Sequence, residues 1–176
     1  MDQVIDNLKS VSLSGNDIYN ACEKNILILK NSDMYRFKTI DQVFGQYNGV
    51  ALLYELKPGY GHWVLLLRHP KTHTIEFFDS YGFFIDDQLK FINKQFRKQS
   101  RQDKRYLSKL LLDSDYNIIY NKKRVQKMKK GISSCGRHLC LRYMLRDTEL
   151  DKYIDMLGSG KLKNTDDTVT YLTAFI

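Results

Sequence analysis

Residues 133–145 read Ser-Ser-Cys-Gly-Arg-His-Leu-Cys-Leu-Arg-Tyr-Met-Leu, a turn of small residues followed by an apolar helical pattern. The stretch predicts a helix that begins at Cys135, with the two serines in capping position and Gly136 directly after the thiol. The first turn of a helix has free N–H groups and a partial positive charge, and both favour a thiolate over a thiol. Cys135 therefore has the setting of a reactive cysteine.

Two upstream stretches supply the partners that a cysteine nucleophile needs. Gly61-His62-Trp63 opens an apolar run, and Phe-Phe-Asp-Ser-Tyr-Gly at residues 77–82 closes the next run. If the two runs pair as an antiparallel hairpin, the start of one lies opposite the end of the other, which makes His62 and Asp79 neighbours. The carboxylate then orients the imidazole and stabilises its charged form, as the acid of a catalytic triad does.

The remaining thiols fit a structural role. Cys22 and Cys140 fall within apolar helical patterns, so we expect both to be buried. A zinc site built on Cys135, His138 and Cys140 has neither the usual ligand spacing nor an evident fourth ligand. We therefore expect no metal centre.

The composition predicts a globular protein with one domain over residues 1–176. Hydrophobic residues make up 43% of the 176 residues, and only 2 are proline. No apolar run reaches the roughly 18 residues of a membrane span, and the start, Met-Asp-Gln-Val-Ile-Asp-Asn, lacks the features of a signal peptide. The 3 widely spaced cysteines favour a reducing compartment. We expect a protein that is neither secreted nor bound to a membrane.

The net charge of +8 is concentrated in one region. Residues 94–130 contain 13 of the 28 Lys and Arg residues and 3 of the 20 Asp and Glu residues. A long helix is predicted over residues 86–112, and one side of it presents a row of basic residues: Lys94, Lys98, Arg101, Arg105 and Lys109. Such a row predicts contact with an anionic partner such as nucleic acid.

The predicted fold class is α+β, with a small antiparallel-rich sheet packed between helices. Short apolar runs separated by turns predict strands at residues 50–56, 63–67, 75–78 and 116–120. Besides the helices at 86–112 and from Cys135, helical patterns occur after Ser14 and at residues 39–44, 149–157 and 166–175.

Three motifs in this order, Gly-His62-Trp63, Phe-Phe-Asp79-Ser-Tyr-Gly and Ser-Cys135-Gly, resemble those of the adenain and Ulp-type cysteine peptidases. The resemblance covers roughly residues 45–145 and is greatest to the small maturation proteases of adenoviruses, virophages and Maverick-type elements. It implies an adenain-like, papain-like arrangement with the nucleophile at a helix N-terminus. The clan also has a glutamine before the cysteine that binds the oxyanion; Gln126 is the candidate, although it lies farther upstream than in the clan.

The resemblance also implies roles for the residues. Cys135 would attack the substrate carbonyl, with His62 as base, Asp79 as orienting acid and Gln126 as oxyanion donor. Trp63 is expected beside the imidazole and, with Gly136, in the substrate site.

The implied substrates are capsid or other viral precursor proteins, cut near small residues such as glycine. The chemistry needs no cofactor, although DNA or a viral peptide is expected as an activator. We expect a monomer in the cytoplasm or nucleus of the host cell and in the virion.

Three other functions remain open from the sequence. A Ulp-like isopeptidase that removes SUMO or ubiquitin would use the same triad. A clan-related acetyltransferase would use a similar triad with an acyl donor. A basic nucleic-acid-binding protein without catalysis would depend on residues 94–130 and would not need Cys135.

Overall fold

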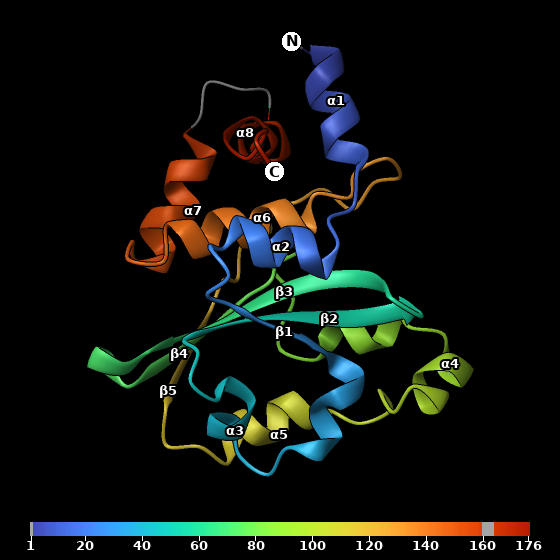
Figure 1. Cartoon of the computed structure of the whole chain (residues 1–176), viewed down its shortest axis with the longest axis vertical. Coiled ribbons are helices and arrows are strands. Elements are labelled where there is room, and N and C mark those ends of the chain that lie inside the picture. Colours follow the sequence, from blue (N-terminus) through green and yellow to red (C-terminus); the bar gives the residue numbers. More distant parts are fainter. Residues whose placement is uncertain (1, 160–163) are drawn as a thin grey trace.

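The computed structural model describes residues 2–159 and 164–176. Within these residues a mixed sheet separates two layers of helices (Figure 1). The strands are β1 (Leu27–Lys30), β2 (Gly49–Lys57), β3 (Tyr60–His69), β4 (Thr74–Phe78) and β5 (Asn117–Tyr120). The α-helices are α1 (Asp2–Ser10), α2 (Gly15–Ala21), α3 (Ile40–Phe44), α4 (Lys94–Gln99), α5 (Tyr106–Leu112), α6 (Cys135–Met144), α7 (Leu150–Gly158) and α8 (Thr165–Leu172). Short 3-10 helices are η1 (Asn31–Arg36), η2 (Pro70–Thr72) and η3 (Asp87–Phe91).

The strands lie side by side in chain order, β1-β2-β3-β4-β5. The predicted antiparallel sheet is confirmed for β2, β3 and β4, where Leu65 on β3 is paired with Phe78 on β4. The two outer strands differ, because β1 pairs in parallel with β2 and β5 pairs in parallel with β4. The sequence analysis did not predict β1. This strand has four residues and no alternating burial, so its apolar pattern carries little period-two signal.

Each face of the sheet has its own hydrophobic core. Alternate residues of β3 point to opposite faces, so Leu65 and Leu67 pack under α2, α6 and α7, while Val64 and Leu66 pack against α3 and α5. Figure 1 shows α1, α2, α6, α7 and α8 on one side of the sheet, and α3 and α5 on the other. The layered arrangement matches the predicted α+β class.

The predicted helix over residues 86–112 is wrong. The segment forms η3, α4 and α5, separated by loops. The break between α4 and α5 includes Arg101, whose φ is +58°, and Gln102, whose buried amide both accepts from the Glu55 N–H and donates to the Glu55 carbonyl. Pairing of Gln102 with the β2 backbone holds the chain out of a helix at this point.

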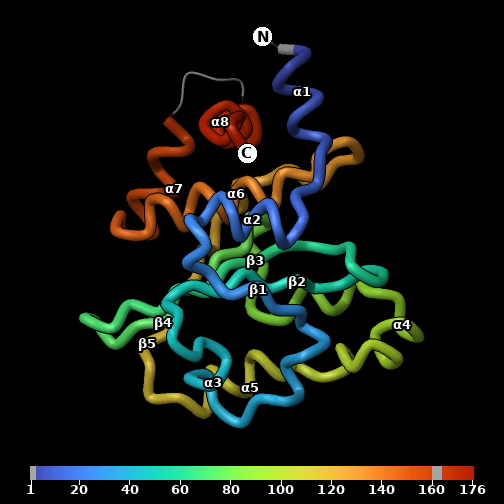
Figure 2. The backbone as a smooth tube through the Cα atoms, viewed as in Figure 1, coloured from blue at the N-terminus to red at the C-terminus, as the bar shows by residue number. Residues whose placement is uncertain are grey.

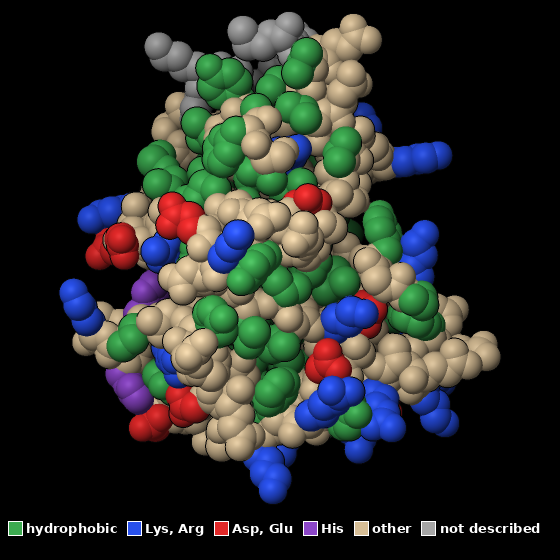
Figure 3. Space-filling model, in the orientation of Figure 1, with side chains coloured by type: hydrophobic (Ala, Val, Ile, Leu, Met, Phe, Trp, Pro, Cys, Tyr) green, Lys and Arg blue, Asp and Glu red, His purple; other side chains and the backbone are tan. Residues whose placement is uncertain are grey.

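The basic row on that segment does not exist as one helix face. Its members are distributed over α4, the following loop and α5: Lys94, Lys98, Arg101, Arg105 and Lys109. Arg105 donates to the Ile85 carbonyl and to Asp87, and the Arg101 guanidinium stacks over Tyr35. Figure 3 shows Lys and Arg side chains most densely in the lower part of this face, on the side of α4. The basic residues therefore share a region of the surface but not a single helix face.

The other predicted helices are present with shifted ends. Ser14 begins α2 in a full capping box with Asp17, and Thr39 caps α3, which ends at Gly45. The analysis did not predict α1, which packs against α8, so both ends of the described chain lie on the same side of the molecule (Figure 2). No helix among the described residues is long and apolar enough to cross a membrane.

Candidate active site

The start of β3 is brought unusually close to β2, and Gly61 makes this possible. A Cβ on Gly61 would lie 1.8 Å from the carbonyl oxygen of Tyr54, so no other residue fits without moving a strand. The register between β2 and β3 is irregular at the same point. This close approach places His62 at the edge of the core, with 3% of its surface exposed.

His62 and Asp79 form the pair that the hairpin register predicted. The distance from His62 Nε2 to Asp79 Oδ1 is 2.7 Å, and both side chains are buried. The same Asp79 oxygen accepts the N–H of Tyr81 at 2.8 Å. Asn121 fixes the Asp79 backbone, because its amide accepts from the Asp79 N–H at 2.9 Å and donates to the Asp79 carbonyl at 2.6 Å.

The thiol of Cys135 completes this group at the first residue of α6. It lies within hydrogen-bonding reach of the His62 side chain. Because Asp79 occupies His62 Nε2, the ring nitrogen that remains for the thiol is Nδ1. The backbone N–H groups of Trp63 and Gly136 lie close enough to the sulfur to favour its thiolate form.

The absence of a side chain at Gly136 lets α6 begin here. A Cβ on Gly136 would lie 2.9 Å from the Cβ of Leu13, which packs across the helix start. The backbone N–H of Gly136, which the sequence analysis placed in the substrate site, helps to lower the pKa of Cys135.

The electrostatics of the group favour a thiolate beside an imidazolium. Burial alone would lower the pKa of His62, but the charge and hydrogen bond of Asp79 and the nearby Cys135 raise it to about 10. Burial alone would raise the pKa of Cys135, but the hydrogen bond and charge of His62 and the two backbone N–H groups lower it below its ordinary value. Both directions favour moving the proton from sulfur to nitrogen.

Tyr81, which the sequence analysis did not single out, stacks on the imidazole. The ring centroids of His62 and Tyr81 are 4.3 Å apart and the planes differ by 12°. Burial and the negative charges of Cys135 and Asp79 raise the pKa of Tyr81 to about 12, so its hydroxyl stays protonated at neutral pH. The only sequence signal was its place in the turn after Asp79.

Trp63 does not have the predicted place in the substrate site. Its indole belongs to the core under α6 and donates to the Leu13 carbonyl at 3.0 Å. Neighbouring residues on a strand face opposite ways, which explains why the side chain after His62 enters the core. Only the backbone N–H of Trp63 faces the sulfur.

Gln126 lies in the same site despite its distance from Cys135 in the sequence. Its buried Oε1 accepts from Ser80 Oγ at 2.6 Å, and its backbone N–H donates to the Ser80 carbonyl at 2.9 Å. Because Ser80 occupies the oxygen, the amide is oriented with Nε2 as its donor end, and Nε2 donates to Tyr81 Oη at 3.5 Å. Gln126 and Cys135 line one cavity.

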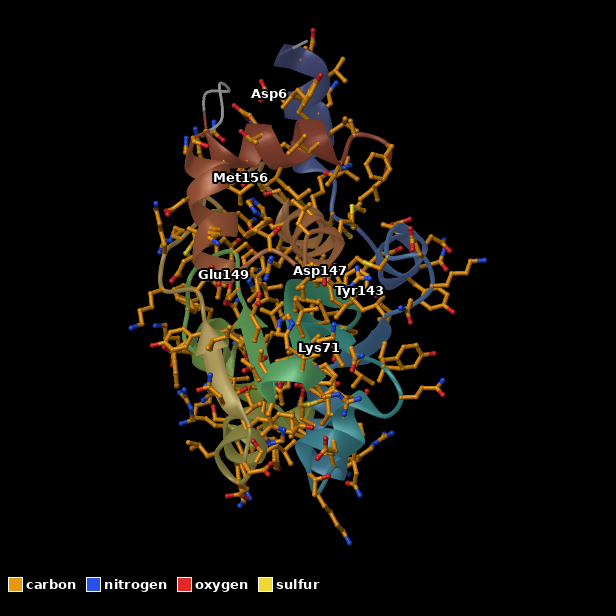
Figure 4. The ribbon with its side chains drawn as sticks, turned by 90° about the vertical axis from the view of Figure 1, so that its left-hand side faces the viewer. Asp6, Lys71, Tyr143, Asp147, Glu149 and Met156 are labelled. Atoms are coloured by element: carbon orange, nitrogen blue, oxygen red, sulfur yellow. The ribbon has the colours of Figure 1, made fainter. Side chains whose placement is uncertain are left out.

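This cavity has a volume of about 230 Å³. Its walls include His62, Tyr81, Gln88 and the Cys135 thiol, and partly exposed apolar side chains form its rim: Leu56, Tyr60, Phe91 and Met128. A larger cavity of about 580 Å³ lies at the opposite end of β3, where Figure 4 shows Lys71 below Asp147 and Glu149. Cys135, His62 and Gln126 line the small cavity and not the larger one, so the small cavity is the candidate site.

The serine before the nucleophile does not cap α6 as predicted. Ser134 occupies the N-cap position, but its hydroxyl bonds Asp166 of α8 instead of a backbone N–H. His138 is fully buried and bonds Asp166 as well. Cys140 lies in the core beside Cys22, away from this group. Among the described residues, no cluster of three His, Cys, Asp or Glu side chains has the geometry of a metal site.

Comparison with known proteins gives one close relative and several structures of similar fold. No protein-family model matches the chain. The uncharacterized protein V9 of Sputnik virophage is 36% identical over 168 residues, a match that covers 94% of this chain and 95% of V9.

Among solved structures, the ASFV pS273R protease aligns with a TM-score of 0.51 at 14% identity, over 93% of this chain and 67% of that protein. The SUMO protease Ulp1 aligns with a TM-score of 0.40 at 16% identity, over 96% of this chain and 73% of Ulp1. The likeness to the ASFV protease confirms the predicted fold.

Proposed function

The chain belongs to the same family as protein V9 of Sputnik virophage, and we propose that it is a cysteine endopeptidase with Cys135 as nucleophile. The observation that carries the proposal is the position of His62. One ring nitrogen is 2.7 Å from a buried carboxylate, and the thiol at a helix N-terminus lies at the other nitrogen. A base held between an acid and a thiol is the arrangement that activates a cysteine for attack on a carbonyl carbon.

The reaction follows from these positions. His62 takes the proton of Cys135, and the thiolate attacks the scissile carbonyl carbon to form a C–S bond. The oxyanion that develops is bound by the backbone N–H of Cys135 and by Gln126 Nε2. His62 then gives its proton to the leaving amine as the C–N bond breaks. A water molecule, deprotonated by His62, hydrolyses the thioester and releases the thiolate.

Other residues hold this machinery in place. Asp79 keeps the imidazole in the orientation that directs Nδ1 at sulfur, and Asn121 holds the Asp79 backbone. Tyr81 covers one face of the imidazole, so the ring cannot tilt away from the thiol. Ser80 orients the Gln126 amide.

A protein substrate is supported by the rim of the cavity. Leu56, Tyr60, Phe91 and Met128 are between 37% and 47% exposed, which suits contact with the side chains of an extended peptide. Kinship with a virophage protein supports processing of viral capsid or precursor proteins as the biological role, with the host cell and the virion as the place of action.

The test is cleavage of a peptide library by the wild type and by Cys135→Ala side by side. We expect discrete cleavage sites with the wild type and none with the variant. Cys140→Ala is the matched control, because it removes a buried thiol that faces Cys22 and leaves Cys135 in place. If Cys135→Ala cleaves as fast as the wild type, the proposal is wrong.

The same preparations separate the competing functions. Labelling by ubiquitin or SUMO probes without peptide cleavage would identify an isopeptidase. Turnover of acetyl-CoA that depends on Cys135 would identify an acetyltransferase.

A further inference from the structure

A second buried acid, Asp166, bonds the residue that precedes Cys135. Asp166 lies in the first turn of α8 and contacts both segments that carry the reacting groups. We propose that Asp166 is a positioning residue, which fixes the distance between the Cys135 sulfur and the Gln126 amide. The inference rests on the proposed function and assigns Asp166 no contact with substrate.

The contacts of the carboxylate are specific to each oxygen. Asp166 Oδ1 accepts from Ser134 Oγ at 2.7 Å and from His138 Nε2 at 3.0 Å. Asp166 Oδ2 accepts from the Lys127 N–H at 3.0 Å. His138 Nδ1 has no partner within the described residues, so His138 donates through Nε2.

Two of these partners are adjacent in sequence to a residue of the proposed reaction. Ser134 directly precedes Cys135, and Lys127 directly follows Gln126. One carboxylate therefore bonds the turn that presents the sulfur and the loop that presents the oxyanion donor. Thr165, the residue before Asp166, adds a hydrogen bond from its hydroxyl to the Val125 carbonyl on the same loop.

Because Asp166 is buried, its carboxylate needs hydrogen-bond donors in place of water. The side chains of Asp166 and His138 are both 0% exposed. A buried carboxylate is tolerated only when hydrogen bonds replace its water, and here three donors do so. Burial alone would raise the pKa of Asp166, but His138, the Lys127 N–H and Ser134 lower it, so the group stays charged.

The cluster is not a second catalytic triad. Ser134 and His138 both donate to the same oxygen of Asp166, so His138 Nε2 is directed at the acid and not at the hydroxyl. All three residues are 0% exposed, and none of them lines the cavity in front of Cys135. Substrate has no access to this Ser-His-Asp group, which leaves a positioning role.

The test compares Asp166→Asn with Asp167→Asn. The Asp166 amide keeps the volume but presents a donor where the carboxylate accepted, so at least one of its hydrogen bonds is lost. The neighbouring Asp167 pairs with the Lys9 side chain of α1 and, within the described residues, makes no direct hydrogen bond to the nucleophile turn or the Gln126 loop. The Ser133 N–H donates to the Lys9 backbone carbonyl, a bond that does not involve the Lys9 side chain. Its replacement is therefore a matched loss of charge on the same helix.

We expect Asp166→Asn to lower kcat by about 10- to 100-fold with KM within about twofold, because small misplacements of reacting groups cost that much. Asp167→Asn should keep the wild-type kcat. Equal losses in the two variants would contradict the proposal, since they would reflect helix stability alone. So would a folded Asp166→Asn enzyme with wild-type kcat.

The pH dependence of Cys135 alkylation by iodoacetamide gives an answer that needs no substrate. Removal of a negative charge alone would lower the pKa of Cys135, because a thiolate is then easier to form. Displacement of the turn at Ser134 would also move the Cys135 sulfur away from His62, and loss of that contact would raise the pKa of Cys135. Our proposal requires the rise, and a fall would overturn it.

Two further points keep the experiment decisive. If Asp166→Asn does not fold, Ser134→Ala removes only the hydrogen bond between Ser134 and Asp166. A smaller rise in the pKa of Cys135 is then expected, and an unchanged or lower pKa would overturn the proposal. If the wild type cleaves no peptide, the proposed function fails, whereas the alkylation profiles still decide whether Asp166 positions Cys135.

Discussion

Two buried histidine–aspartate pairs lie on either side of Cys135, the proposed nucleophile, and they differ in what the second nitrogen of each imidazole faces. The His62–Asp79 distance is 2.7 Å and the His138–Asp166 distance is 3.0 Å, and all four side chains are buried. The second nitrogen of His62 faces a thiol, and that ring lines a cavity. The second nitrogen of His138 has no partner among the described residues. Hydrogen-bond distance and burial therefore do not distinguish the two pairs, whereas the neighbouring thiol and the access to the cavity do.

The largest loss of activity is expected when the base of the His62–Asp79 pair, or the thiol beside it, is removed. His62→Ala and Cys135→Ala should each abolish turnover, and the double variant should be no worse, because triad members act as a unit. Single-turnover assays of the three variants measure this.

Replacement of the histidine in the His138–Asp166 pair should have a much smaller effect on kcat. His138→Gln should cost less than about tenfold in kcat, since a glutamine amide still donates to Asp166. A loss as complete as that of His62→Ala would end the distinction between the pairs.

The acids should rank in the same order. Asp79→Asn should lower kcat by about 10²- to 10⁴-fold with the fold intact, by analogy with loss of a triad acid. This exceeds the loss proposed for Asp166→Asn. Steady-state kinetics on both variants checks the order, with circular dichroism to verify folding. A reversed order would show that catalysis had been assigned to the wrong pair.

The oxyanion donor should have the next largest effect. Gln126→Ala should lower kcat by about 10²- to 10³-fold with little change in KM, because the donor acts on charge that develops during the reaction. Ser80→Ala should cost less, since it only frees the amide to rotate. A normal kcat in Gln126→Ala would move the oxyanion role to another group.

The pH profile tests the charges directly. Activity should fall on acidification as the Cys135 thiolate, whose pKa is lowered, gains a proton, and it should fall again as pH rises through about 10, where His62 loses one. Iodoacetamide with mass spectrometry should modify Cys135 first.

The other two thiols serve as internal controls. Cys22 and Cys140 are about 1% exposed or less, so they should react slowly. The hydrogen bond with Cys22 and burial raise the pKa of Cys140 as well. Faster modification of Cys22 or Cys140 than of Cys135 would contradict the assignment of the nucleophile.

The smallest effect concerns nucleic acid. Lys94 and Lys98 are exposed on α4, and we expect Lys94→Glu with Lys98→Glu to weaken duplex DNA binding for all sequences alike, with the log-log salt slope reduced by about one per lysine. Cleavage of a short peptide should not change. If titration at low salt detects no DNA binding by the wild type, the basic residues have another role.

The sequence analysis found the parts of the site that depend on local structure. His62 and Asp79 lie on one hairpin, 17 residues apart, so strand pairing was enough to predict their contact. Cys135 was evident from the turn before an apolar helix.

The supporting residues depend on contacts that no local pattern encodes. Asn121 reaches Asp79 across 42 residues, and Asp166 reaches Lys127 and Ser134 across 39 and 32. The long helix over residues 86–112 was wrong for the same reason, because Gln102 bonds β2 across 47 residues. The substrate-site role of Trp63 was suggested by the motif, whereas strand alternation directs its ring into the core.

The location of the acid and base on a single hairpin has a consequence for the order of folding. A β3–β4 hairpin closes a short loop, whereas α6 must find the sheet over a much longer stretch of chain, at a greater entropic cost. Imidazole and carboxylate can therefore meet while the thiol is still unactivated and far away. The Cys135 thiol therefore gains its imidazole partner only once α6 has packed against β3.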